Sequence, residues 1–274
     1  MLTKNELKVL WKAEGFRPLK RFGQNFLIDK NIKDKIVRSL DVGPDDTVLE
    51  VGAGFGEITF DLASRAKRVF AVEKDKKIAA ILRSVVKLPE NVTLLEQDFL
   101  DLDIKAVAGN KKITVYGSLP YYITTPIIEK LFDNIQHIKG IYFVVQKEFA
   151  ERILARPGTK SMARISLFVQ YFTAPRRMFM IGKECFYPAP EIDSAFLKLE
   201  IPENPRVSVN SEELLFRVIK SAYSQRRKTL LNSLSSLGLG KTELSKLLKA
   251  AKIDPKSRAE NLSLEDFARL TSAL

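Results

Sequence analysis

One strand–helix–strand segment constrains the fold of this chain more than any other stretch. Thr47 to Val51 is an apolar run that ends in glycines, and Arg68 to Val72 forms a second apolar run. Between the two runs, apolar side chains recur at helical spacing at Ile58, Leu62 and Ala63. The pattern predicts a buried strand, a helix and a second buried strand, in that order along the chain.

Three further apolar runs follow this segment. They are separated by stretches that we expect to form helices or loops, and they lie at residues 92–98, 112–118 and 140–146. Strands that alternate with helices favour a parallel sheet with helices on both faces. We therefore predict an α/β fold with a Rossmann-like sheet.

The character of the sequence changes after residue 200. Ser211 is a candidate helix N-cap, and apolar residues follow it at helical spacing: Leu214, Leu215, Val218, Ile219 and Ala222. The segments 237–251 and 263–274 predict two more short amphipathic helices. We therefore divide the chain into an α/β domain, residues 1–204, and a smaller all-helical domain, residues 205–274.

The glycines between the first strand and the helix predict a ligand-binding loop. Gly52, Gly54 and Gly56 allow positive φ angles and a close approach of backbone to ligand. Glu73 ends the next predicted strand, where a carboxylate accepts hydrogen bonds from both hydroxyls of a ribose. A purely structural turn is the alternative. The glycines and the acid together favour a nucleoside cofactor.

The residue after the last of these glycines narrows the choice of cofactor. A dinucleotide fingerprint needs a third glycine where this chain has Glu57, whose charge would repel pyrophosphate. A cofactor without phosphates, such as S-adenosylmethionine, fits better, because its sulfonium cation tolerates Glu50 and Glu57. Asp98 and Phe99 follow the third predicted strand, where Asp98 could accept from the adenine amine and Phe99 could pack on the ring. The alternative for Asp98 is an exposed loop residue.

A Ser-Leu-Pro-Tyr corner ends the fourth apolar run, at the edge where open α/β sheets bind ligands. Pro120 fixes the backbone, so that the Ser118 side chain and the Leu119 carbonyl can accept hydrogen bonds from one amine nitrogen. Tyr121 offers a face for stacking a base, which is worth about 1–3 kcal/mol. A buried aromatic residue in an ordinary turn explains the same four residues equally well.

Charge and composition bear on the partner. The chain of 274 residues carries 45 Lys and Arg against 33 Asp and Glu, a net charge of +12, which suggests a polyanion such as nucleic acid. General solubility is the alternative.

The single cysteine, Cys185, excludes a disulfide framework and a cysteine-rich metal site. No apolar run approaches the roughly 18 residues that cross a bilayer, and no signal peptide is evident, so we expect a cytoplasmic protein.

A set of motifs is distributed along the chain: KRFGQNFL (20–27), LEVGAGFGEIT (49–59), VFAVEKD (69–75), QDFL (97–100), SLPYYITTPII (118–128), VVQKEFAERILARPGTK (144–160), CFYPAPEIDSA (185–195), QRRKTLLNSL (225–234) and RAENLSLEDF (258–267). Through these motifs, from about residue 17 to its end, the chain resembles the bacterial ribosomal RNA adenine N6-dimethyltransferases of the small (16S) subunit, the dimethyladenosine synthases. The 23S ribosomal RNA methyltransferases of erythromycin resistance share the cofactor motifs, but the segments 225–234 and 258–263 resemble the small-subunit family.

The resemblance implies a role for each matching residue. It implies a Rossmann-like S-adenosylmethionine-dependent methyltransferase domain over 1–204, an RNA- or ribosome-binding helical domain over 205–274, S-adenosylhomocysteine as product and no metal. Cofactor contacts are expected at Asn25, Leu27, Gly52, Gly54, Glu73, Asp98, Phe99 and Ser118. Catalytic roles are expected at Ser118, Leu119, Pro120, Tyr121 and Phe186, with Phe186 capping the target base. The family has asparagine where this chain has Ser118, and we expect weakened activity from that departure.

The expected reaction is dimethylation of N6 on two adjacent adenosines near the 3′ end of 16S ribosomal RNA, by a monomer that acts on the 30S pre-subunit. Alternatives are a catalytically weak assembly factor on the same fold, a 23S ribosomal RNA adenine N6-methyltransferase and a small-molecule methyltransferase. RNA contacts are expected at basic clusters, although each pair alone is more typical of a solvated face. The candidates are Lys20, Arg21, Arg152, Arg226, Arg227 and Lys228, with Arg156, Arg176 and Arg177 beside them.

Overall fold

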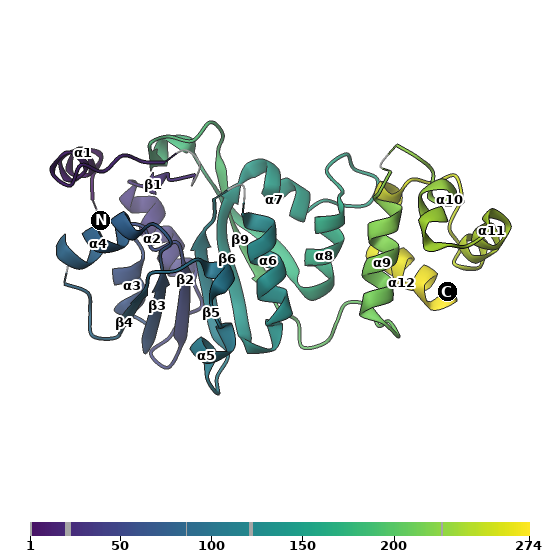
Figure 1. Ribbon diagram of the computed structural model, residues 1–274, viewed down its shortest axis with the longest axis horizontal. Coiled ribbons are helices and arrows are strands. Elements are labelled where there is room, and N and C mark those ends of the chain that lie inside the picture. Colours follow the sequence, from purple (N-terminus) through teal and green to yellow (C-terminus); the bar gives the residue numbers. More distant parts are fainter. Residues whose placement is uncertain (1, 20–22, 86, 121–122, 226) are drawn as a thin grey trace. The chain divides into compact units, whose positions relative to one another are not determined.

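The computed structural model (Figure 1) describes the chain except for residues 1, 20–22, 86, 121–122 and 226. The described residues form two compact units. The first unit holds residues 1–147 and 176–200, and the second holds residues 148–175 and 201–274. No helix among the described residues is long and apolar enough to cross a membrane.

A seven-stranded sheet forms the centre of the first unit, as far as the described residues show. Its strands lie in the order β4 (Val92–Leu95), β3 (Arg68–Val72), β2 (Thr47–Val51), β5 (Ile113–Ser118), β6 (Ile138–Gln146), β9 (Ser194–Glu200) and β7 (Ala174–Ile181). The strands from β4 to β6 pair in parallel, and β9 pairs antiparallel to β6. The predicted α/β class is therefore confirmed, and so is parallel pairing for the strands from β4 to β6. Strand β9 and the edge strand β7, which make the sheet mixed, were not predicted.

Both faces of this sheet are covered. Val48 and Leu49 are neighbours on β2 and are both fully buried, as are Ile113 and Val115 on β5 with Thr114 between them. Because successive strand residues point to opposite faces, burial of neighbours requires packing on each side. The helices of the same unit are α1 (Lys4–Ala13), α2 (Lys30–Ser39), α3 (Thr59–Ala63), α4 (Lys76–Val85), α5 (Ile104–Ala108) and α6 (Thr124–Asp133).

The second unit is helical. Ser211 caps α9 (Glu212–Ala222) by accepting a hydrogen bond from the backbone N–H of Leu214, which confirms the predicted N-cap. The other helices of this unit are α7 (Lys147–Ile153), α8 (Arg164–Phe172), α10 (Leu230–Ser233), α11 (Lys241–Ala250) and α12 (Leu264–Ala273). The buried faces of α8 to α12 share one apolar core that includes Leu167, Leu248 and Phe267.

The composition of this unit differs from the division expected at residue 205. Residues 148–175, which carry α8 and almost all of α7, group with the C-terminal helices. Leu167 and Tyr171 of α8 belong to the same apolar core as Leu215 of α9, and the Tyr171 hydroxyl donates to Oε1 of Glu212 at 2.8 Å. An apolar helix face finds its partner far along the chain here, and local sequence does not reveal which partner it takes. The functions assigned to the two domains stay predictions.

Candidate active site

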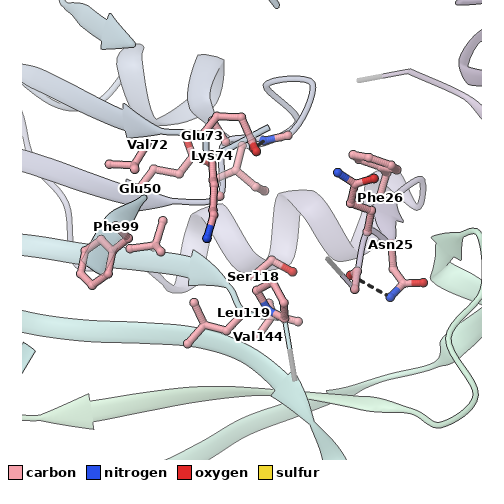
Figure 2. A pocket seen from close by; sticks show the side chains of 18 of the residues that line it. Asn25, Phe26, Glu50, Val72, Glu73, Lys74, Phe99, Ser118, Leu119 and Val144 are labelled. Carbon is pink, nitrogen blue, oxygen red and sulfur yellow. Dashed lines mark hydrogen bonds between the residues drawn. The ribbon is translucent and has the colours of Figure 1, made fainter. Parts of the chain in front are cut away.

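A pocket opens at the carboxyl ends of β2, β3 and β5 (Figure 2). It also receives the residues that follow β4 and two segments from outside the main sheet. The pocket brings together eleven of the residues predicted as cofactor-binding or catalytic: Asn25, Leu27, Gly52, Gly54, Glu73, Asp98, Phe99, Ser118, Leu119, Pro120 and Phe186. The twelfth, Tyr121, lies outside the described residues, as does Tyr122.

The glycine loop is fastened to the neighbouring strand. The backbone N–H groups of Gly52 and Ala53 both donate to the carbonyl of Val72, at 2.9 and 3.0 Å. Gly52 has φ of 82° and Gly54 has φ of 56°, in the left-handed region that other residues avoid. A Cβ at Gly54 would lie 3.0 Å from Oε2 of Glu57. The backbone angle therefore favours glycine at position 54, and a Cβ there would also crowd the Glu57 carboxylate.

Glu73 is held in place by backbone donors. Its Oε2 accepts from the N–H of Gly54 at 3.0 Å, and its Oε1 accepts from the N–H of Asp75 at 2.9 Å. Burial raises the pKa of Glu73, and these two hydrogen bonds oppose the rise. Each carboxylate oxygen has a second lone pair, so both remain able to accept a hydrogen bond from a ligand hydroxyl.

Two more acids line the pocket: Glu50 is buried, and Glu57 is partly buried. Burial raises the pKa of Glu50 to about 8 and that of Glu57 to about 7. The Thr59 hydroxyl donates to Oε2 of Glu50 at 2.6 Å, whereas Oε1 of Glu57 is buried without a partner among the described residues. An acid with a buried, unused acceptor atom suits a cationic ligand and disfavours a phosphate. This donor set therefore fits the expected sulfonium cofactor.

Asp98 is paired rather than free in a loop. Its Oδ1 accepts from the N–H of Leu100 at 3.0 Å, and the Lys74 ammonium donates to its Oδ2 at 2.5 Å. Burial acts to raise the pKa of Asp98, but the Lys74 and Leu100 hydrogen bonds outweigh it and lower that pKa. Figure 2 shows the Lys74 side chain projecting from the end of β3 into the pocket. We had not predicted Lys74, although its place directly after Glu73 was a signal.

The Ser-Leu-Pro corner continues the end of β5. Ser118 is paired with Val144 of β6, and the Leu119 N–H donates to the Val144 carbonyl at 3.0 Å. The Pro120 carbonyl then accepts from the Ile123 N–H and the Thr124 hydroxyl, which closes the turn before α6. Leu119 is buried, whereas the Ser118 residue is exposed at the pocket edge. The corner therefore has a fixed backbone with an accessible hydroxyl.

A two-stranded sheet connects the two outer segments of the pocket. In it, β1 (Phe26–Leu27) pairs antiparallel with β8 (Phe186–Tyr187), and Leu27 stands opposite Phe186. The pairing continues through the Ile28 N–H, which donates to the Cys185 carbonyl at 2.8 Å. Residues about 160 positions apart in the chain are thus neighbours at the pocket. The Asn25 amide donates to the Gly23 carbonyl at 3.1 Å (Figure 2).

The basic residues predicted to contact RNA are only partly described. Lys20, Arg21 and Arg226 lie outside the described residues. The others are exposed: Arg152 and Arg156 near α7, Arg176 and Arg177 in β7, and Arg227 and Lys228 after α9. Exposure is compatible with phosphate contact and equally with a solvated face, so RNA binding by these residues stays a prediction.

Comparisons with known proteins extend over nearly the whole chain. A family model described as ribosomal RNA adenine dimethylase matches residues 15–274. A ribosomal RNA small subunit methyltransferase A from Moorella thermoacetica is 41% identical, over 99% of this chain and 98% of its own, and one from Bacillus pumilus is 42% identical, over 97% and 94%. A crystal structure of a dimethyladenosine transferase from Plasmodium falciparum is similar with a TM-score of 0.75 at 25% identity, covering 89% of this chain and 95% of that one. The 23S rRNA methyltransferase ErmE shares the fold, with a TM-score of 0.71 at 24% identity over 91% of this chain and 99% of its own.

Proposed function

Because this chain belongs to the ribosomal RNA adenine dimethylase family, we propose that it methylates the small-subunit ribosomal RNA. The target is N6 of two adjacent adenosines near the 3′ end of 16S ribosomal RNA, modified during assembly of the small subunit. One observation carries the proposal: a single pocket collects the glycine loop, the buried acids and the Ser-Leu-Pro corner. Relatives at about 40% identity over the full chain carry the matching name and support it.

The cofactor is S-adenosylmethionine, which supplies an electrophilic methyl group when bound. Glu73 accepts hydrogen bonds from the ribose hydroxyls, and Asp98 accepts one from the adenine amine, with Phe99 packed on the ring. Gly52 leaves room for the methionine end, and Asn25 and Leu27 cover the cofactor from the β1 side. Glu50 and Glu57 have raised pKa values in the cofactor-free pocket, and a bound cation would favour their charged forms, because an opposite charge lowers the pKa of a carboxyl group. S-adenosylhomocysteine is the product, and no metal takes part.

The corner positions the attacking nitrogen. The lone pair of an adenine amine is delocalised into the ring, and hydrogen bonds from N6–H to the Ser118 hydroxyl and the Leu119 carbonyl favour a pyramidal nitrogen with a directed lone pair. Pro120 holds these acceptors in place, and Tyr121 and Phe186 are expected to hold the flipped base between them. Because the proton leaves after attack, no strong base is needed, and catalysis is mostly positioning.

A second transfer to the same nitrogen makes one further demand. The monomethylated amine carries one hydrogen, so one of the two acceptors at the corner must release its hydrogen bond. Ser118 is suited to do so, because its residue is exposed and its hydroxyl can rotate towards water. The protein acts as a monomer on the 30S pre-subunit, with its exposed basic residues along the RNA.

The proposal is tested with methyl-labelled S-adenosylmethionine and 30S particles from cells that lack the modification. We expect label in 16S ribosomal RNA, and none in 50S particles from a strain without 23S modification. Binding to 30S particles without incorporation would instead support an assembly factor, and label only in 50S particles would support a 23S enzyme. An Asp98→Ala variant, which removes the adenine contact, serves as the negative control.

A further inference from the structure

An aromatic cluster joins the N-terminal helix α1 to the pocket. We call it the Trp11 cluster, and its members are Trp11, Phe16, Phe26, Phe55 and Tyr187. The Trp11 ring stacks on Tyr187 with centroids 5.1 Å apart and planes at 16°, and meets the edge of Phe26 at 5.8 Å. Phe26 in turn lies 4.7 Å from Phe55 of the glycine loop. One indole thus contacts both strands of the β1–β8 sheet.

The cluster reaches the cofactor site in two short steps. Phe26 lines the pocket, and its ring carbon Cδ1 lies 3.6 Å from the position that a Cβ would take on Gly54. The Gly54 N–H then donates to Oε2 of Glu73 at 3.0 Å. A displacement of Phe26 would therefore loosen the glycine loop and the proposed ribose acceptor together.

The chain after α1 is tied to the same strand end. The Lys77 ammonium donates to the Gly15 carbonyl at 2.6 Å, and the Gln24 amide donates to Oδ2 of Asp75 at 2.7 Å. Asp75 also donates its N–H to Glu73. The segment after α1 is thus tied to the segment after β3, and the Gln24 contact continues through Asp75 to Glu73.

We propose that Trp11 is a positioning residue for the cofactor. It touches neither the pocket nor the reacting atoms, and it acts by holding Phe26 on the glycine loop and Tyr187 on the outer strand. Helix α1 precedes residues 15–274, the region that the family model matches. The positioning role of Trp11 would therefore add a residue from outside that region to the cofactor site. The identity of the ligand rests on the proposed function.

The chemistry of Trp11 indicates what it contributes. Its Nε1–H is buried without a hydrogen-bond partner among the described residues, so the indole serves through its apolar faces. A phenyl ring at this position retains stacking on Tyr187 and loses only an unsatisfied donor. Removal of the ring leaves Phe26 and Tyr187 without their common neighbour. Trp11→Phe should therefore retain the cofactor affinity that Trp11→Ala loses.

The first test compares Trp11→Ala and Trp11→Phe with the parent protein by calorimetric binding of S-adenosylmethionine and by steady-state methylation. Loss of two aromatic contacts predicts about a tenfold higher Kd and KM for the cofactor in Trp11→Ala, with kcat within about threefold of the parent. Trp11→Phe should stay within about threefold in all three quantities. Ile104→Ala is the matched control, because Ile104 is a buried residue of α5 that does not line the pocket.

The outcomes separate the two proposals. An unchanged Kd in Trp11→Ala, or an equal rise in Ile104→Ala, would overturn the positioning role while leaving the proposed function intact. A parent protein that binds no S-adenosylmethionine would overturn the proposed function and the positioning role with it. If Trp11→Ala does not fold, Tyr187→Leu replaces it, because Tyr187 stacks on the indole without lining the pocket.

A second measurement needs no variant. Trp11 is the only tryptophan of the chain, so its fluorescence reports the cluster alone. Addition of S-adenosylhomocysteine to the parent protein should change the emission in a saturable way, with a midpoint equal to the calorimetric Kd. Binding seen by calorimetry without any change in emission would contradict coupling between the cluster and the pocket.

Discussion

Glu50 and Glu57 are pocket acids whose protonation changes within the physiological range. In the unfolded chain both ionise near their ordinary pKa of 4.5, whereas in the folded protein their pKa values are about 8 and about 7. The folded state therefore binds more protons between these limits, and the free energy of unfolding falls as pH rises. Burial also raises the pKa of Tyr116, which stays neutral in this pH range, and the pKa of Glu73. Neither residue therefore reverses the trend.

The difference between the folded and unfolded pKa values of Glu50 and Glu57 predicts that the cofactor-free protein is most stable at mildly acidic pH. Denaturant unfolding at several pH values between about 5 and 8 should show a falling free energy of unfolding, by up to about 1.4 kcal/mol per pH unit for each acid. Glu50→Gln removes one of the two contributions and should flatten the curve. Asp98 is no source of this slope, because its lowered pKa lies below 3.8. Equal slopes in the parent and in Glu50→Gln would contradict the assignment.

Ser118 gives a second prediction at the scale of one residue. A serine hydroxyl reaches less far than an asparagine amide, and it rotates between the corner and water because the residue is exposed. Ser118→Asn should make the hydrogen bond to the target amine more secure, worth about 1 kcal/mol or about fivefold in rate. Single-turnover methylation of 30S particles measures this rate. A slower Ser118→Asn enzyme would show that the hydroxyl is the better acceptor here.

The end of β5 is the element to which we assign the chemistry, and its Gly117 lies close to β2. A Cβ at Gly117 would lie 2.9 Å from Leu119 Cδ2 and 3.1 Å from the Val51 carbonyl oxygen. Gly117→Ala should therefore shift the corner, cost about 1–3 kcal/mol of stability and lower kcat more than cofactor affinity. Thermal unfolding and single-turnover rates measure both effects. Gly240→Ala is the matched control, because Gly240, like Gly117, has no positive φ and nothing lies within 4 Å of its Cβ position.

The elements also show what sequence reasoning reached and what it missed. The glycine loop, the strand ends at Glu73 and Asp98 and the Ser211 cap were predicted because each depends on neighbouring residues. The two-residue strands β1 and β8 pair across about 160 residues and have no period to detect. The Lys74–Asp98 pair depends on two strands lying side by side. Long-range pairing of short segments therefore limits prediction of this site more than its chemistry does.

At the scale of the whole molecule, charge is the property most relevant to the partner. A net charge of +12 predicts that affinity for ribosomal RNA falls steeply with salt, because bound cations displace counterions from phosphates. The double variant Arg227→Ala with Lys228→Ala should reduce the slope of log Kd against log salt by roughly 1–2. Lys111→Ala with Lys112→Ala removes the same charge from exposed residues at the amino end of β5 and should leave the slope almost unchanged. An affinity that does not depend on salt would contradict a phosphate-tracking surface.

The modified nucleosides themselves test the central claim most directly. Unmodified 30S particles would be incubated with the protein and S-adenosylmethionine, and the 16S ribosomal RNA would be digested and analysed by mass spectrometry with mapping of the modified fragment. We predict two N6,N6-dimethyladenosines per particle, at adjacent positions near the 3′ end. Methyl groups at other positions, on 23S ribosomal RNA alone or on no RNA at all would contradict it.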